Sequence, residues 1–368
     1  MIVCFDETFE GAAFGEDEIA IDAIEAVCHS VKRGEHYLYG PRRIIKELAF
    51  STVLSAASRA VFQHLQSQFS VVAGMLAQLQ YRVTVSRHGG VIVRESDTRW
   101  TVPASHVARH GVRPTILLAE NAHDGDLYIH AARHYRLSSG LRDVELKVEA
   151  KGGGGAGTTL EFRRTVERAA EWCLCITDSD QECPTGAAGA TATSCGRIAA
   201  EAHSVARHVR TAGRELENVI PTQLLIEAAE KTHPVEVELY QSRMAGFDSG
   251  VSKYLDLKNG LALRRILNFS PEAPTHSYWM PLAEIARERS GFGADCLDAR
   301  TCANSDDCQC KLFEGFGDKV AKKVGEFLGS ESTHKSFERA KGSLNMNDWL
   351  IIGKEVFHAA AAPRPMRS

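Results

Sequence analysis

Short apolar runs alternate with amphipathic stretches through much of the chain. Runs of strand length occur at 2–5, 36–39, 115–119 and 172–177, and the stretch 17–28 carries apolar residues at helical spacing. Short apolar runs bounded by turn-forming residues are typical of buried strands, and amphipathic segments between them are typical of helices that cover a sheet. The pattern therefore predicts an α/β protein.

The N-terminal part, residues 1–110, is predicted to be a small α/β domain. Residues 43–81 have a mostly helical pattern. The segments 81–86 and 91–94 alternate apolar and polar residues on either side of a Gly-Gly pair, which predicts a β-hairpin.

The central part, residues 111–235, has the most regular pattern. Strand, helix, strand, glycine-rich turn, helix and strand follow one another, and this order predicts a parallel sheet with right-handed crossovers and flanking helices. The strands are expected at 115–119, 144–150 and 172–177, the glycine-rich turn at Gly152 to Gly155, and the second helix at about 158–171.

The remaining segments are less regular. Residues 184–196 are rich in Gly, Ala, Thr and Ser and are predicted to form a mobile loop or turn region, and residues 197–210 are predicted to be helical. Residues 236–368 show mainly helical pieces and a cysteine-containing stretch, so they are predicted to form a third, mostly helical domain.

Composition and charge set limits on this picture. The chain has 368 residues, 44% of them apolar, which is enough for two or three domains with their own cores. A net charge of −4 does not indicate a generic polyanion binder, although it leaves room for a locally basic face. The first residues lack a signal-peptide pattern, and the apolar runs fall short of the roughly 20 residues that span a bilayer. We therefore predict a cytoplasmic protein without a membrane segment, with its cysteines reduced.

Acidic residues follow two of the predicted central strands, at the point where each strand ends. Glu120 and Asp124 come after the run 115–119, and Asp178 and Asp180 come after the next apolar strand. The carboxyl ends of neighbouring parallel strands meet at one edge of a sheet, so these side chains are expected to converge. Clustered carboxylate oxygens suit Mg²⁺ or Mn²⁺. Each pair alone is weak evidence, because such an Asp is more often a helix cap or a solvated turn residue.

The order of these motifs resembles a known family. LeuLeuAlaGlu-x-x-x-Asp at 117–124, followed by CysIleThrAspSerAsp at 175–180, is similar to the TOPRIM domain, the metal-binding catalytic module of topoisomerases, primases and several nucleases. The glycine-rich turn, GluLeuGluAsn at 215–218 and TyrLeuAspLeuLysAsnGly at 254–260 resemble the nuclease branch more closely. That branch comprises the OLD-type (overcoming lysogenization defect) nucleases and the stand-alone TOPRIM nucleases of anti-phage defence systems. Asn121 departs from the family, which commonly has Gly at this position.

The resemblance implies a Rossmann-like parallel sheet and a metal-dependent endonuclease that hydrolyses the phosphodiesters of DNA or RNA. It implies Mg²⁺ or Mn²⁺ held by Glu120, Asp124, Asp178, Asp180 and Glu217. Glu215 is the alternative to Glu217. Glu120, Asp178 and Asp180 are implied to be catalytic, together with Lys258 as a cation that stabilises phosphate charge. Many such nucleases act in antiviral defence beside an ATPase sensor, and since this chain has no Walker motif, a partner ATPase is expected.

Two other functional classes stay open. In the first, the fold binds nucleic acid or a partner subunit without catalysis, and the acidic residues only retain metal. In the second, the chain is a different TOPRIM enzyme, but the motifs of a topoisomerase or a primase are not found. The run Gly152 to Gly155 lacks the lysine of a P-loop, so a nucleotide cofactor is the weaker interpretation. Close backbone approach to nucleic-acid phosphate or simple turn geometry is the stronger one.

Two further groups of residues are candidates for binding. A structural Zn²⁺ could be held by the thiolates of Cys296, Cys302, Cys308 and Cys310. Their spacing differs from that of paired CxxC knuckles, and reduced, partly buried thiols are the alternative. Arginines that could follow a phosphate backbone occur at Arg163, Arg164, Arg207, Arg210, Arg214, Arg264 and Arg265, although such clusters are usually solvated helix faces.

Overall fold

The computed structural model describes residues 1–11, 16–302 and 310–366. These residues form two compact units. Unit 1 consists of Met1–Ile176, Ser194–Val209 and Gly353–Ser368, and unit 2 consists of Thr177–Thr193 and Arg210–Ile352. Each unit combines segments from more than one of the sequence-based domains 1–110, 111–235 and 236–368, and those three ranges stay a prediction.

The first sheet of unit 1 is mainly parallel. Its strands lie in the order β2-β1-β3-β5-β4, and β4 runs antiparallel to β5. The strands are β1 (Ile2–Phe5), β2 (Tyr37–Tyr39), β3 (Arg82–Ser86), β4 (Val93–Ser96) and β5 (Arg99–Pro103). The helices are η1 (Glu7–Phe9), α1 (Glu18–Lys32), α2 (Arg42–Ala49), α3 (Ala56–Leu76) and α4 (Ala104–His110). The predicted strands near 2–5 and 36–39 and the predicted helices near 17–28 and 43–81 are thereby confirmed.

The predicted hairpin between 81–86 and 91–94 is wrong. β3 pairs with β5 in parallel, and β4 forms an antiparallel pair with β5 instead. The segment after β3 is held by the N-terminal part of the chain, because Arg87 donates from its backbone nitrogen to Thr8 Oγ1 (2.9 Å) and pairs with Asp17 (3.2 Å). Alternation identified the strands correctly, but it does not determine which strand pairs with which.

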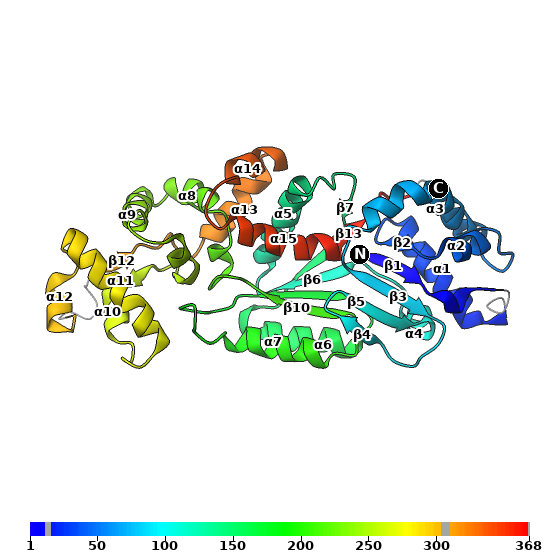
Figure 1. Cartoon of the computed structure of the whole chain (residues 1–368), viewed down its shortest axis with the longest axis horizontal. Coiled ribbons are helices and arrows are strands. Elements are labelled where there is room, and N and C mark those ends of the chain that lie inside the picture. Colours follow the sequence, from blue (N-terminus) through cyan, green and yellow to red (C-terminus); the bar gives the residue numbers. More distant parts are fainter. Residues whose placement is uncertain (12–15, 303–309, 367–368) are drawn as a thin grey trace. The chain divides into compact units, whose positions relative to one another are not determined.

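The second sheet of unit 1 confirms the predicted parallel arrangement. Its strands lie in the order β10-β9-β6-β8, and β6 (Thr115–Ala119) is parallel to β8 (Val148–Gly152) and to β9 (Cys173–Thr177). Helix α5 (Ala122–Ser138) lies on one face of this sheet, and α6 (Thr158–Arg168) and α7 (Ala190–Glu201) lie on the other (Figure 1). A short antiparallel pair, β7 (Glu145–Leu146) with β13 (Ala361–Ala362), and the 3-10 helix η3 (Gly155–Gly157) complete this region.

Apolar side chains from β6 and β9 form the core between the sheet and its helices. They pack against Phe162 of α6 and against Cys195, Ile198 and Ala199 of α7. Burial of this apolar surface is the main force that holds the helices on the sheet.

Two predictions for the segment after β9 are right for 184–189 and 197–201 and wrong for the rest. Part of 184–196 belongs to α7 rather than to a loop, and the predicted helix at 197–210 ends at Glu201 and is followed by strand β10 (Ala206–Arg210). The small residues of this segment allow α7 to lie close to the sheet, where Cys195 and Ala199 are buried.

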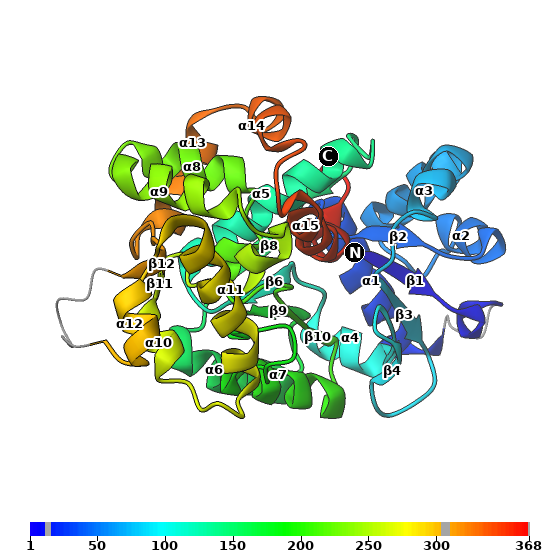
Figure 2. The ribbon, with the colours of Figure 1, turned by 60° about the vertical axis from the view of Figure 1, so that its left-hand side comes forward.

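Unit 2 is mainly helical. Helix α8 (Thr222–Glu230) packs against α9 (Pro234–Met244), α13 (Val320–Ser330) and α14 (Thr333–Ala340), which Figure 2 shows together. The other elements are η4 (Leu216–Asn218), η5 (Ser249–Tyr254), α10 (Leu263–Leu267), α11 (Pro274–Ser290), α12 (Ala294–Ala299) and the pair β11 (Leu261–Ala262) with β12 (Lys311–Phe313). Helix α15 (Met346–Ala360) begins in unit 2 and ends in unit 1. Among the helices of the described residues, none has both the length and the apolar character needed to cross a membrane.

Candidate functional site

The motif Asp178-Ser179-Asp180 is held in unit 2 by its middle residue. Ser179 is fully buried. Its backbone nitrogen donates to Thr211 Oγ1 (3.0 Å), and its hydroxyl donates to the carbonyl of Gly213 (2.6 Å). The serine therefore fixes the motif to the turn at 211–213, while Asp178 on one side stays half-buried.

Asp180 has an uncommon backbone conformation. Its φ is 55°, in the left-handed region that Asp tolerates better than most residues. Its backbone nitrogen donates to the carbonyl of Arg214 (2.8 Å). A Cβ atom at Gly189 would lie 2.8 Å from the Cβ atom of Asp180, so the neighbouring turn accepts only glycine. The backbone of Asp180 is thus held in place while its side chain is exposed.

Asn218 joins the segment that carries Glu215 and Glu217 to the segment 252–255. Its side chain is fully buried. Its Nδ2 donates to the carbonyls of Ser252 (2.7 Å) and Leu255 (2.8 Å), and its Oδ1 accepts from the backbone nitrogen of Glu215 (2.8 Å). The 3-10 helix η4 at this point brings both glutamates of the GluLeuGluAsn segment to the same part of unit 2.

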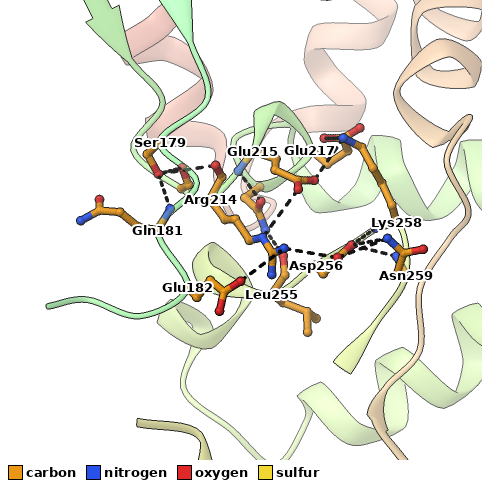
Figure 3. A network of polar contacts seen from close by, with 12 residues as sticks. Ser179, Gln181, Glu182, Arg214, Glu215, Glu217, Leu255, Asp256, Lys258 and Asn259 are labelled. Atoms are coloured by element: carbon orange, nitrogen blue, oxygen red, sulfur yellow. Dashed lines mark hydrogen bonds and ion pairs between the residues drawn. The ribbon is translucent and has the colours of Figure 1, made fainter. Parts of the chain in front are cut away.

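Lys258 lies among acidic side chains of unit 2 (Figure 3). Its Nζ is 3.1 Å from Glu215 Oε2 and 3.4 Å from Glu217 Oε2. Burial lowers the pKa of Lys258, but the charges of Glu217, Glu215 and Asp178 outweigh this effect and hold the pKa above its ordinary value. The side chain of Glu217 is 3% exposed and that of Lys258 is 30% exposed, so a nearly buried carboxylate meets a cation that still reaches solvent.

A second ion network, which the sequence did not reveal, lies beside Lys258. Arg214 is 3.4 Å from Asp256 and 3.7 Å from Glu182, and Arg265 also pairs with both of these acids. Asp256 is buried and accepts from the backbone nitrogens of Lys258 (3.1 Å) and Asn259 (2.8 Å). Asp256 therefore shapes the turn that carries the lysine in the segment 254–260.

Glu120 and Asp124 belong to unit 1. Glu120 directly follows β6 and is half-buried. Asp124 is the third residue of α5, and its Oδ2 accepts from the backbone nitrogen (3.0 Å) and the side-chain Nδ2 (3.2 Å) of Asn121. Asp124 thus forms a capping box with Asn121, which is the helix-cap role weighed against metal ligation.

The glycine-rich turn after β8 closes on the chain's own backbone. A Cβ atom at Gly152 would lie 2.7 Å from the backbone nitrogen of Ala122, and one at Gly153 would lie 2.3 Å from Thr158 Oγ1. The backbone nitrogen of Gly155, which has a φ of 62°, donates to the carbonyl of Glu120 (2.9 Å). These contacts account for the glycines through turn geometry and close contact within unit 1.

The donor chemistry in unit 2 suits a hard divalent cation. Asp178, Asp180 and Glu217 offer only carboxylate oxygens, which are the ligands that Mg²⁺ and Mn²⁺ prefer. Within the described residues, no group of three or more His, Cys, Asp or Glu side chains is arranged to hold a metal ion. In this geometry the cation beside Glu217 is the ammonium group of Lys258.

The predicted zinc ligands are placed only in part. Cys308 lies outside the described residues. Cys296 on α12, Cys302 and Cys310 are half-buried. A zinc site at these cysteines stays a prediction. Cys173 and Cys175, by contrast, are core residues, and burial raises the pKa of both thiols.

The arginines suggested for phosphate contact have different environments. Arg207 pairs with Glu355 (3.0 Å) and Asp97 (3.3 Å), and its side chain is 16% exposed. Like Arg214, it takes part in ion pairs within its own unit. The exposed members of the set are Arg163, Arg164, Arg210 and Arg264.

Comparisons of the chain with models of protein families, with curated proteins and with solved structures found no match. The chemistry of the residues described above is therefore the basis for a functional assignment.

Proposed function

We propose that the chain is a divalent-metal-dependent endonuclease that hydrolyses the phosphodiesters of DNA or RNA. The observation that carries the proposal is the arrangement of Glu215, Glu217 and Asp178 around the charge of Lys258 in unit 2. Hydrolysis of a phosphodiester requires oxygen ligands for a hard cation and a fixed positive charge for the phosphate, and this group provides both kinds of residue. The TOPRIM-like order of the motifs supports the same assignment.

The metal in this proposal is Mg²⁺ or Mn²⁺. Its proposed ligands in unit 2 are Asp178, Asp180 and Glu217. When bound, the metal ion lowers the pKa of a water molecule and neutralises charge on the scissile phosphate. Ligation requires ionised carboxylates, so metal binding and the order of these side chains should be coupled.

Lys258 provides the fixed charge. Because its pKa lies above the ordinary value, the ammonium group stays protonated at neutral pH and acts through its charge rather than as a proton donor. Glu215 and Glu217 hold the ammonium group, and Asp256 shapes its turn. A phosphate oxygen of the substrate would compete with Glu215 for this nitrogen, since the side chain of Lys258 still reaches solvent.

The biological setting follows from the resemblance. We place the nuclease in anti-phage defence, together with a partner ATPase that senses infection, because the related nucleases work in such systems and this chain contains no Walker motif.

A second candidate is a TOPRIM-like subunit that binds nucleic acid or a partner without cleaving. The observation that favours it is the pairing of Lys258 with Glu215 and Glu217. The ammonium group already balances negative charge of these carboxylates without a metal ion.

Cleavage of plasmid DNA, single-stranded DNA and bulk tRNA in Mg²⁺ or Mn²⁺ tests the proposal. The purified protein is compared with Asp178→Asn and Glu217→Gln, and with Glu326→Gln, whose carboxylate is 66% exposed in a surface ion pair of unit 2. We expect the wild type to cleave at least one substrate and to lose this activity in chelator. The cleavage rate should fall 100-fold or more in the first two variants, on the order of a lost metal ligand or transition-state contact. The rate of the control variant should be unchanged.

Equal cleavage by the wild type and by Asp178→Asn would contradict the nuclease assignment. The second candidate would be supported instead if the protein bound nucleic acid without cleaving it, also with the partner ATPase present, and if both site variants bound nucleic acid equally well.

A further inference from the structure

A cavity in unit 1 carries an excess of positive charge. Its volume is about 420 Å³, and it is lined by residues of all five strands of the first sheet, of the segment after β2, and of α2 and α3. The lining includes Arg42, Arg82, Arg99, Glu95, Tyr39 and Cys4. Three guanidinium groups thus share the cavity with one carboxylate.

Arg82 and Arg99 lie side by side on neighbouring strands. They are direct partners in the parallel register of β3 and β5. In the described part of the chain, neither arginine forms a salt bridge, and Arg82 makes one hydrogen bond at 3.5 Å to the carbonyl of Leu76. Like charges in adjacent positions on a sheet repel one another, so this pair is stabilised by an anion placed between them.

The sheet topology marks one end of this cavity as a binding site, whereas Arg82 and Arg99 are the first residues of β3 and β5 and lie toward the amino ends of the strands. β1 lies between β2 and β3, so the chain winds first to one side of β1 and then to the other. In open α/β sheets, ligands bind outside the carboxyl ends of the strands at such a switch point. Phe5 at the end of β1 and Gly40 just after β2 line the cavity, and α2 begins at its rim with Arg42. The amino end of a helix favours negative charge.

An aromatic pair and a carboxylate define the rest of the cavity. Tyr39 and Phe69 are stacked, with ring centroids 5.6 Å apart, and the guanidinium of Arg42 lies 5.8 Å from the Phe69 ring centre. The carboxylate of Glu95 accepts a hydrogen bond from the Thr101 hydroxyl at the side of the cavity that holds Arg99. A carboxylate of this kind can bind the hydroxyl groups of a ribose.

We propose that this cavity binds a free nucleoside diphosphate or triphosphate. Arg42, Arg82 and Arg99 hold the phosphates, and Glu95 binds the ribose. The volume lies within the range of about 300 to 1,000 Å³ that is usual for small-molecule sites. This site is separate from the acidic residues of unit 2, and its occupancy does not depend on the nuclease assignment.

Calorimetric titration of the full chain with ADP, GTP and inorganic pyrophosphate tests the proposal. Chelator in the buffer removes divalent cations, so the result does not depend on metal binding in unit 2. Variants Arg82→Gln and Arg99→Gln are compared with Arg43→Gln, which lies beside Arg42 on α2 but does not line the cavity. Thermal unfolding of each variant verifies that the fold is retained.

We expect ADP or GTP to bind the wild type. Each cavity variant should bind it about tenfold or more weakly, as loss of a charge-assisted hydrogen bond does. The Arg43→Gln variant should bind as the wild type does. No nucleotide binding at millimolar concentration would overturn the proposal. Equal weakening of nucleotide binding by Arg43→Gln would overturn it as well. If pyrophosphate bound as tightly as ADP, the assignment to a nucleotide would be overturned.

Discussion

The ammonium nitrogen of Lys258 lies 3.4 Å from a carboxylate oxygen of Glu217, and the carboxylate is far less exposed than the lysine. The two residues come from segments 41 positions apart in the sequence (258 minus 217). The buried side chain of Asn218 brings these segments together through hydrogen bonds to the carbonyls that precede Lys258. A nearly buried acidic group and its cation are therefore positioned by one amide side chain.

Removing the cation from this pair should destabilise the protein. For Lys258→Met we expect a loss of about 2 kcal/mol in the free energy of unfolding, less than for a fully buried pair because the lysine reaches solvent. Urea unfolding measures the change. Lys322→Met, which removes one partner of an exposed ion pair with Glu326, should lose less than about 0.5 kcal/mol. Adding Glu217→Gln to Lys258→Met should recover part of the loss, and no recovery would show that the pair is not coupled.

Asn218→Ala should destabilise the protein more than the loss of a few side-chain atoms alone would. The substitution leaves two carbonyls and the backbone nitrogen of Glu215 without their partner at a fully buried position. We expect a loss of about 2 to 4 kcal/mol in urea unfolding, because unsatisfied buried polar groups are costly. Asn259→Ala is the matched control, since Asn259 is exposed and its amide donates to Asp256 at 3.3 to 3.4 Å. Equal losses in the two variants would contradict the linking role of Asn218.

In the glycine-rich segment after β8, a substitution by alanine should destabilise the protein at Gly152 but not at Gly157. Gly152→Ala places a Cβ atom 2.7 Å from the backbone nitrogen of Ala122, and backbone cannot move aside cheaply. We expect a destabilisation of about 1 to 3 kcal/mol, seen as a lower Tm. Gly157 has open space around its Cβ position and a φ of −74°, so Gly157→Ala should leave the Tm unchanged or raise it slightly.

His358 should make the stability of the protein depend on pH. It is buried on α15 beside the rings of Tyr135 and Phe357, and within the described residues neither ring nitrogen has a hydrogen-bond partner. Burial lowers the pKa of His358 to about 4. Its pKa in the unfolded chain is about 6.5, so the unfolded state binds more protons between these values, and stability falls as the pH drops from 7 to 5.

His358→Phe removes this titration and keeps an aromatic ring in the core. The difference in unfolding free energy between pH 7 and pH 5 should shrink by up to about 2 kcal/mol, as urea unfolding at the two pH values would measure. Substitution of the exposed His334 by Gln should leave the difference unchanged. An unchanged difference in His358→Phe would show that this imidazole binds protons equally in the folded and unfolded states and would contradict the lowered pKa.

Two strands of the second sheet, β6 and β9, were predictable because they are short apolar runs followed by acidic residues. The pairing of β6 with β9 follows from that pattern together with the alternation of strands and helices. The partner of β3 was not predictable, since alternation reveals a strand but not its neighbour. The small residues that now form α7 were misread as a loop, because burial against the sheet, rather than helix propensity, stabilises this helix.

For the candidate site, the sequence suggested residues but not their interactions. Glu215 ranked below Glu217, yet it lies closer to Lys258. Glu182 had no motif that marked it, because its role depends on contacts with Arg214 and Arg265 that only the folded chain creates. Asp256 did stand two residues before the lysine in the Asp-x-Lys-x-Gly element, and that position was the one available signal.

Mn²⁺ binding measured by electron paramagnetic resonance examines the metal site of unit 2 without requiring a known substrate. We expect one or two bound ions per wild-type chain. The affinity should be at least about tenfold weaker in Asp178→Asn and Glu217→Gln, as for a lost ligand, and unchanged in Glu326→Gln. Equal Mn²⁺ binding by all four proteins, or none by the wild type, would contradict the assignment of these carboxylates as metal ligands.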